Sequence, residues 1–124
     1  MADLTPDQQI DSAIALVTGA NPMAGIRLLR EVLTEDSNNL RAHFELGKFS
    51  IQSGQYAKAR ERFKRVLEID PTFAEAYPHL AQVAIIEEDT AEAIQYFEQY
   101  KAAQPDSMVR REVQTYIDEL KGTK

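Results

Sequence analysis

The stretch 54-GQYAKARERFKRVLEIDP-71 begins with a glycine, ends with Asp-Pro and carries apolar residues at helical spacing. An offset of 34 residues aligns it with 88-EDTAEAIQYFEQYKAAQP-105. The residues that this offset brings together are alike in size: Ala59 with Ala93, Phe63 with Phe97, and Pro71 with Pro105. Matches at small and bulky apolar positions are what helix packing requires. The stretch is therefore one unit of a periodic array.

The same offset towards the N-terminus finds a third, more divergent unit, in which Gly25 takes the place of Ala59 and Leu29 that of Phe63. Each unit divides into two helices, because apolar residues recur at intervals of three and four. Helices are predicted near residues 6–18, 22–35, 40–53, 56–69, 73–87, 90–103 and 107–121. The first helix fits best with a one-residue slip, which puts four residues in the core: Ile10, Ala13, Ile14 and Val17.

Small residues mark the places where two helices are expected to approach closely. Gly47 and Ala81 hold this position in the first helix of a unit, and Ala59 and Ala93 hold it in the second. A large side chain there would force the helix axes apart.

Residues that begin and end helices stand at the predicted boundaries. N-terminal caps are predicted at Thr5 (with Gln8), Asn21, Thr72 (with Glu75) and Asp89. Gly54 suits a left-handed residue after a helix. Pro78 falls beyond the first turn of the helix predicted at 73–87, where a proline removes an amide hydrogen bond. Either a slight kink or no consequence is expected there.

The segment 107–121 is predicted to be a terminal capping helix. Its apolar residues form a single stripe: Val109, Val113, Tyr116, Ile117 and Leu120. An open array of helix pairs leaves its last pair with an exposed apolar face, and an amphipathic helix covers that face.

Composition narrows the class of protein. The 124 residues suit one domain, and a net charge of −6 argues against binding to nucleic acid or to an acidic membrane surface. Without cysteine the chain has no disulfide and no thiolate ligand or nucleophile. No apolar run is long enough to cross a membrane. We expect a cytoplasmic protein, with the periplasmic domain of a membrane-anchored protein as the alternative.

These units resemble tetratricopeptide repeats. The second unit carries the resemblance most fully, through Leu46-Gly47, Gly54-Gln55-Tyr56, Ala59, Phe63, Leu67 and Asp70-Pro71. The third unit shares Tyr77, Leu80-Ala81, Ala93, Phe97 and Pro105. The resemblance implies one domain over residues 1–124, a right-handed α-solenoid of three helix pairs (about 6–39, 40–73 and 74–107) and a capping helix at about 107–121.

Proteins of this family usually bind other proteins, in a concave groove lined by the first helix of each unit. The resemblance implies that the second unit presents Arg41, Phe44, Glu45, Lys48 and Gln52 there. The third unit would present Glu75, Pro78, His79, Gln82 and Ile86, and the first unit Asp11 and Ala15. Phe44 would be the apolar anchor, and Arg41 and Lys48 would pair with acidic groups of the partner. Glu45, Glu75 and His79 would bind polar groups of the partner.

One subset of the family holds the C-terminal carboxylate of chaperone tails with Lys, Asn and Arg at these positions. This chain departs from that pattern, with Glu45 in place of Asn, and Glu75 and His79 in place of Lys and Arg. Carboxylates facing a carboxylate repel it. The sequence therefore predicts no such clamp.

No pattern of residues predicts catalysis, a cofactor or a metal. His43 and His79 lie 36 residues apart and so hold different positions in their units. His43 occupies a packing position, and a metal site would need further converging ligands. No motif for a serine nucleophile, a phosphate-binding loop or a zinc protease occurs. We expect no enzyme activity.

Two charge clusters are either solvated helix surface or a contact between molecules. The basic cluster consists of Lys58, Arg60, Arg62, Lys64 and Arg65, and the acidic one of Glu87, Glu88, Asp89, Glu92 and Glu98.

The leading hypothesis for function is a non-catalytic module that binds a peptide or helix of a partner protein in its concave groove. The alternatives are a module that forms homo-oligomers and a soluble part of a larger membrane-anchored protein.

Overall fold

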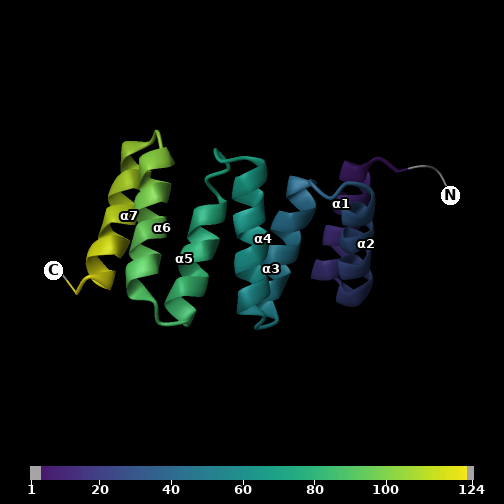
Figure 1. Ribbon diagram of the computed structural model, residues 1–124, viewed down its shortest axis with the longest axis horizontal. Coiled ribbons are helices and arrows are strands. Elements are labelled where there is room, and N and C mark those ends of the chain that lie inside the picture. The colour runs from purple at the N-terminus through teal and green to yellow at the C-terminus, as the bar shows by residue number, and fades with distance from the viewer. Residues whose placement is uncertain (1–3, 123–124) are drawn as a thin grey trace.

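The computed structural model describes residues 4–122, and over that range it contains seven α-helices and no strand (Figure 1). The helices are α1 (Pro6–Thr18), α2 (Pro22–Glu35), α3 (Leu40–Gln52), α4 (Tyr56–Ile69), α5 (Ala76–Ile86), α6 (Thr90–Ala103) and α7 (Ser107–Leu120). The prediction of an all-α chain is confirmed.

Consecutive helices form hairpins that stand side by side along the long axis of the molecule (Figure 1). The hairpins are α1–α2, α3–α4 and α5–α6, and α7 packs on α6 at the C-terminal end. The first helices also meet one another, since α1 contacts α3 and α3 contacts α5. The architecture is the predicted solenoid of three helix pairs with a seventh helix at its end.

The core follows the stack as two clusters of apolar side chains. The first cluster joins the first unit to α3 through Ile10, Ala13, Ile26, Leu29, Val32, Ala42 and Leu46. The second joins α3 and α4 to α5 through Phe44, Ala59, Phe63, Val66, Ala76, Leu80 and Val83. Each fully buried Val, Leu, Ile or Phe side chain contributes about 2 kcal/mol to folding. Burial of Ile10 and Ala13 confirms the one-residue slip predicted for the first helix.

Two glycines hold the places where helices come closest. A Cβ on Gly47 of α3 would lie 2.8 Å from the Phe63 ring, and a Cβ on Gly25 of α2 would lie 2.6 Å from the carbonyl oxygen of Ala13. Both distances are shorter than the contact distance of a Cβ to a ring carbon or to a carbonyl oxygen. The prediction that small residues permit close helix approach is confirmed at Gly47.

Three of the predicted N-terminal caps are present. The Thr5 hydroxyl accepts a hydrogen bond from the amide of Gln8 at 3.2 Å, and the Gln8 side chain accepts one from the amide of Thr5 at 2.9 Å. Asn21 and Asp89 accept from amides in the first turns of α2 and α6. These bonds satisfy amides that have no partner inside the helix.

The predicted capping box of Thr72 and Glu75 is wrong. Thr72 instead donates both its amide and its hydroxyl to the carboxylate of Asp70, at 2.9 and 2.6 Å. Glu75 precedes α5 without a capping hydrogen bond from its side chain. The helix begins at Ala76, three residues later than predicted.

Pro78 accounts for this late start. It is the third residue of α5, so it lies inside the first turn rather than beyond it. Because proline has no N–H, the carbonyl of Ala74 cannot accept a helical bond from residue 78. That carbonyl accepts from the amide of Tyr77 instead, at 3.0 Å. The tighter turn before Ala76 replaces the helical turn that the sequence predicts.

The seventh helix buries part of its apolar stripe. Val113 and Ile117 are 6% and 0% exposed, whereas Tyr116 is 59% exposed. None of the helices in residues 4–122 has the length and hydropathy of a membrane span.

Candidate functional site

The surface formed by the first helices carries seven of the twelve residues predicted for a groove. We call it the inner face, and its members are Arg41, Glu45, Lys48 and Gln52 on α3, Glu75 just before α5, and His79 and Gln82 on α5. Each is at least partly exposed. The charges of Lys48, Glu75 and Glu45 all act on His79, so α3 and α5 bring these groups close together.

Arg41 is already paired within the chain. Its guanidinium donates to Asp7 at 3.2 Å and to Asp11 at 2.8 Å, and both carboxylates belong to α1. The hydrogen bond that Arg41 donates to Asp11 raises the pKa of Arg41. Arg41 therefore joins the first helices of the first two units, and a partner's carboxylate would have to compete with Asp7 and Asp11. Ala15, further along α1, is exposed.

Lys48 has two neighbours on α3. Its ammonium lies 3.3 Å from the carboxylate of Glu45 and 5.1 Å from the centre of the Phe44 ring. A cation above an aromatic face is attracted to it by about 0.5–1 kcal/mol at an exposed site. The lysine covers Phe44 and leaves the charge of Glu45 partly neutralised.

Phe44 lies in the core, which contradicts its prediction as an exposed anchor. Its side chain is 9% exposed, and its ring meets those of Phe63 and Phe73 at 5.7 and 5.2 Å between centroids, with edge-to-face geometry. The family resemblance placed Phe44 on the concave face of α3, as the apolar anchor of the groove. The side chains of the next unit cover it.

The two histidines are held by packing. The His79 ring stacks on Phe63 at 4.9 Å between centroids, and burial lowers its pKa. His43 is 8% exposed, and its Nε2 lies 2.9 Å from the carbonyl oxygen of Ser37. The interpretation of His43 as a packing residue is confirmed. Within residues 4–122, no three side chains of metal-binding type converge.

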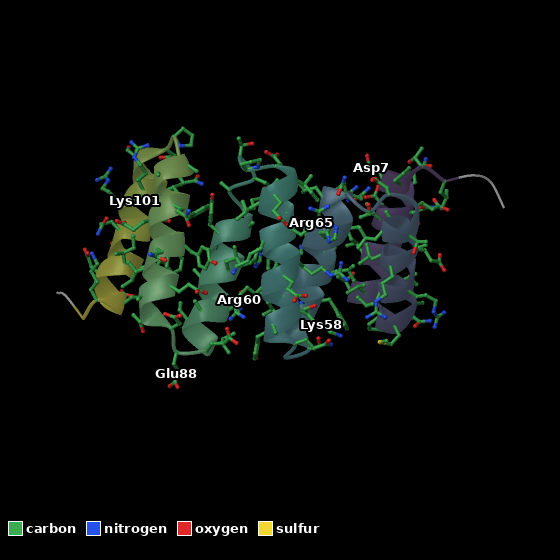
Figure 2. The ribbon with its side chains drawn as sticks, in the orientation of Figure 1. Asp7, Lys58, Arg60, Arg65, Glu88 and Lys101 are labelled. Atoms are coloured by element: carbon green, nitrogen blue, oxygen red, sulfur yellow. The ribbon has the colours of Figure 1, made fainter. Side chains whose placement is uncertain are left out.

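The two charge clusters meet inside one molecule. Arg60 pairs with Glu87 and with Glu92, so the basic α4 contacts the acidic end of α5 and the start of α6 (Figure 2). Arg65 pairs with Glu68 at 3.6 Å, and Lys101 with Glu98 at 3.0 Å. The contact between molecules that the sequence suggested would have to compete with these internal pairs.

An apolar groove of about 490 Å³ lies between α5, α6 and α7. We call it the C-terminal groove. Its lining residues are Pro78, Gln82, Ile85, Ile86, Phe97, Tyr100, Val109, Glu112, Val113 and Tyr116. It exists because, among the described residues, α7 contacts α6 but not α5, unlike the first helices of the other units.

The sequence pointed to one side of this groove only. Pro78, Gln82 and Ile86 are predicted for the groove of the third unit, whereas the residues of α7 are predicted for its buried stripe alone. Ile86 is 42% exposed and its neighbour Ile85 is 43% exposed. Two adjacent isoleucines at the end of a helix widen its apolar surface beyond a single stripe, and this signal could have shown an exposed apolar patch. Tyr116 stacks on Phe97 at 5.9 Å, which keeps its ring at the edge of the groove.

Comparisons with known proteins agree on the fold. A family model described as tetratricopeptide repeat matches residues 20–83 and 50–112. No curated protein sequence matches the chain. The solved structure of SycD, a type III secretion translocator chaperone of Yersinia enterocolitica, aligns with a TM-score of 0.83 at 15% identity, over 96% of this chain and 87% of that one.

Two further solved structures are similar. MamA aligns with a TM-score of 0.78 at 18% identity, over 95% of this chain and 64% of that chain. YrrB, described as a TPR protein with an unusual peptide-binding site, aligns with a TM-score of 0.76 at 21% identity, over 92% and 59%. The chain thus spans about two thirds or less of the length of these two proteins.

Proposed function

The chain belongs to the tetratricopeptide repeat family, and on that premise we propose that it is a non-catalytic module that binds a peptide or helix of a partner protein. The binding surface is the inner face, continued at its C-terminal end by the C-terminal groove. The observation that carries the proposal is the apolar groove itself, with Ile85, Ile86 and Tyr116 exposed beside it.

The groove suits an amphipathic segment. Its volume of about 490 Å³ lies in the range of sites that enclose several side chains. A helix laid in such a groove inserts apolar residues spaced by three and four. Anchors that fill the space between Ile86 and Tyr116 would remove both side chains from water.

The charges at the rim indicate the polarity of the occupant. Glu112 lines the groove, and Glu112 and Glu119 line the adjoining depression beside Tyr116. The whole chain carries a net charge of −6. A partner segment with apolar anchors flanked by lysine or arginine complements this surface, and opposite charges speed its association.

The two histidines with lowered pKa need no catalytic explanation. Burial is the leading cause of the lowered pKa of both His43 and His79, and each ring contacts structural neighbours. Perturbed groups of this kind arise in packed cores as well as in active sites.

The test compares proteins captured from an extract of the source cells. The bait proteins are the wild type, the double variant Ile86→Ser/Tyr116→Ser, and the control Met23→Ser/Met108→Ser. The control also removes two exposed apolar side chains, 60% and 63% exposed, which do not line the groove. We expect proteins that the wild type and the control retain and the groove variant loses. The interacting segment of each is then titrated as a peptide by calorimetry. If all three baits retain the same proteins, the groove is not the binding surface.

A further inference from the structure

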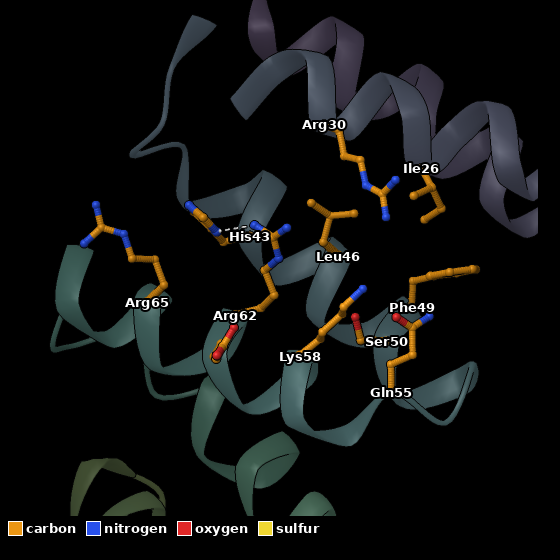
Figure 3. Close-up of a pocket in the computed structure, with 11 residues that line it drawn as sticks. Ile26, Arg30, His43, Leu46, Phe49, Ser50, Gln55, Lys58, Arg62 and Arg65 are labelled. Atoms are coloured by element: carbon orange, nitrogen blue, oxygen red, sulfur yellow. Dashed lines mark hydrogen bonds between the residues drawn. The ribbon is translucent and has the colours of Figure 1, made fainter. Parts of the chain in front are cut away.

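A second cleft opens on the other side of α3, between the second helices α2 and α4 (Figure 3). Its volume is about 390 Å³. We call it the outer cleft, and its charged lining residues are Arg30 from α2 and Lys58, Glu61, Arg62 and Arg65 from α4. Figure 3 shows Arg30 reaching down from α2 while Lys58 and Arg62 reach up from α4 into the same space.

The outer cleft is positive on a chain that is negative as a whole. Four cations and one glutamate line it, although the net charge of the chain is −6. Arg30, Lys58 and Arg62 form no ion pair with any of the residues that the structure describes. Among the described residues Arg62 bonds only to the neutral ring of His43, so the positive charges of Arg30, Lys58 and Arg62 are available to pair with an anion from outside the chain.

One of these cations is fixed in place and partly out of water. The guanidinium of Arg62 lies 3.2 Å from Nδ1 of His43, which orients it in the cleft. Burial lowers the pKa of Arg62, and the charge of Arg30 lowers it further. A bound anion offsets the repulsion between the two arginines, and its attraction to Arg62 compensates for the water that Arg62 has lost.

The uncharged walls add a second requirement. Ile26 and Leu46 line the cleft but are only 2% and 4% exposed. The apolar surface open to a ligand is therefore that of Phe49, which is partly exposed. A free phosphate ion would use the cations and leave this surface uncovered. Carboxylate side chains next to apolar ones match both parts, because arginine pairs with carboxylates in a planar, two-bonded geometry.

We propose that the outer cleft binds an acidic peptide segment of a partner protein, in which carboxylate and apolar side chains stand close together. This site is separate from the inner face and does not rest on the proposed function there. A second copy of the chain is a poorer occupant. In its acidic cluster Glu87 and Glu92 already pair with Arg60.

The test uses a fluorescently labelled peptide of repeated Glu-Glu-Leu, acetylated and amidated at its ends, and a Gln-Gln-Leu peptide as its neutral counterpart. The variant is Arg30→Gln/Lys58→Gln. Its matched control is Arg27→Gln/Lys64→Gln, which removes two charges from the same two helices at exposed positions that do not line the cleft. Because net charge changes equally, a difference between them reports the cleft alone.

We expect the acidic peptide to bind the wild type, to weaken about tenfold in the cleft variant and to stay within about twofold in the control. Added salt should weaken it as well, and the neutral peptide should not bind. Three results would overturn the proposal: no binding to the wild type, equal weakening in both variants, or complete displacement by micromolar tripolyphosphate. Light scattering that shows self-association lost only in the cleft variant would overturn it in favour of a second copy.

Discussion

Arg62 donates a hydrogen bond to Nδ1 of the buried His43, with 3.2 Å between the nitrogens. A guanidinium can only donate, so Nδ1 must accept with its lone pair. The imidazole proton therefore sits on Nε2, which donates to the carbonyl of Ser37 at 2.9 Å. This arrangement ties α4 to α3 and to the turn before it, and it requires a neutral histidine.

Stability is expected to fall as pH drops below about 6.5. Burial first, and then the charge of Arg62, lowers the pKa of His43 below its ordinary value of 6.5, and burial lowers that of His79 in the same direction. Between the lowered pKa and 6.5 the unfolded chain binds more protons than the folded one. The stabilisation is complete above 6.5 and is lost progressively below it.

Urea unfolding at about pH 7.5 and about pH 5.5 measures this effect. The wild type should have the lower midpoint in acid, and His43→Gln and His79→Gln should each show a smaller difference between the two pH values. Asp70, whose pKa is also lowered, titrates below its ordinary value of 3.8 and does not contribute in this range. Equal midpoints for the wild type would contradict the neutral histidines.

Replacing Gly47 with alanine is expected to destabilise the fold. The added carbon would lie 2.8 Å from Cζ of Phe63, a ring that is fully buried and stacked on His79. Overpacking of this kind costs about 1–3 kcal/mol, against about 1 kcal/mol gained from alanine's helix propensity.

A double-mutant cycle with Phe63→Leu checks the reason for this cost. If the clash causes it, Gly47→Ala should cost less in the Phe63→Leu background than in the wild type, as measured by urea midpoints. The same cost in both backgrounds would mean that some other contact is responsible.

Glu88 occupies a backbone conformation that glycine adopts more easily. Its φ is 61°, and it follows α5 by two residues, as Gly54, with a φ of 77°, follows α3. Figure 2 shows its side chain pointing away from the turn. Glu88→Gly should therefore raise the free energy of unfolding, by up to about 1 kcal/mol. Gly54→Ala should lower it by a similar amount, because nothing but the backbone opposes the new methyl group. A loss of stability in Glu88→Gly, measured by thermal unfolding, would refute the comparison.

Much of the fold can be predicted from the sequence because helix packing requires small and bulky apolar residues at positions that recur every 34 residues. Gly47 and Phe63 show this directly, since the small residue exists to make room for the ring. The start of α5 shows the limit of local rules. Thr72 and Glu75 have the spacing of a capping box, but Pro78 has no amide to bond the carbonyl of Ala74, so the helical turn that the box would begin does not continue.

The surfaces were harder to predict, because they depend on the neighbouring unit. The position of Phe44 in the repeat could not show that Phe73 and His79 cover it. The C-terminal groove depends on how far α7 stands from α5, and the buried part of the α7 stripe packs on α6 without fixing that distance. Residues on both sides of the groove carried apolar patterns, but no spacing in either helix specifies the gap.

Phe44→Ala is now expected to destabilise the protein. The ring is 9% exposed and meets three other rings, so its removal leaves a cavity at the centre of the second cluster. Such replacements cost about 3–5 kcal/mol. Glu45→Ala, on the next residue of α3, is the control and should cost much less, because the carboxylate of Glu45 forms one ion pair, with the partly exposed Lys48, and fills no core position. Similar urea midpoints for Phe44→Ala and the wild type would restore Phe44 as an exposed anchor.

The inner face is expected to show no preference for a C-terminal carboxylate. Burial lowers the pKa of His79, which is therefore neutral at pH 7, and Glu45 and Glu75 stand beside it. The cation of Lys48 is engaged by Glu45 at 3.3 Å. A terminal carboxylate would meet two like charges and one occupied lysine.

An acidic peptide with a free C-terminus and the same peptide amidated should bind with equal affinity in fluorescence anisotropy. The measurement uses the Arg30→Gln/Lys58→Gln protein, so that the outer cleft contributes little, and tighter binding of the free-carboxylate form by about tenfold would show that the inner face does grip chain ends.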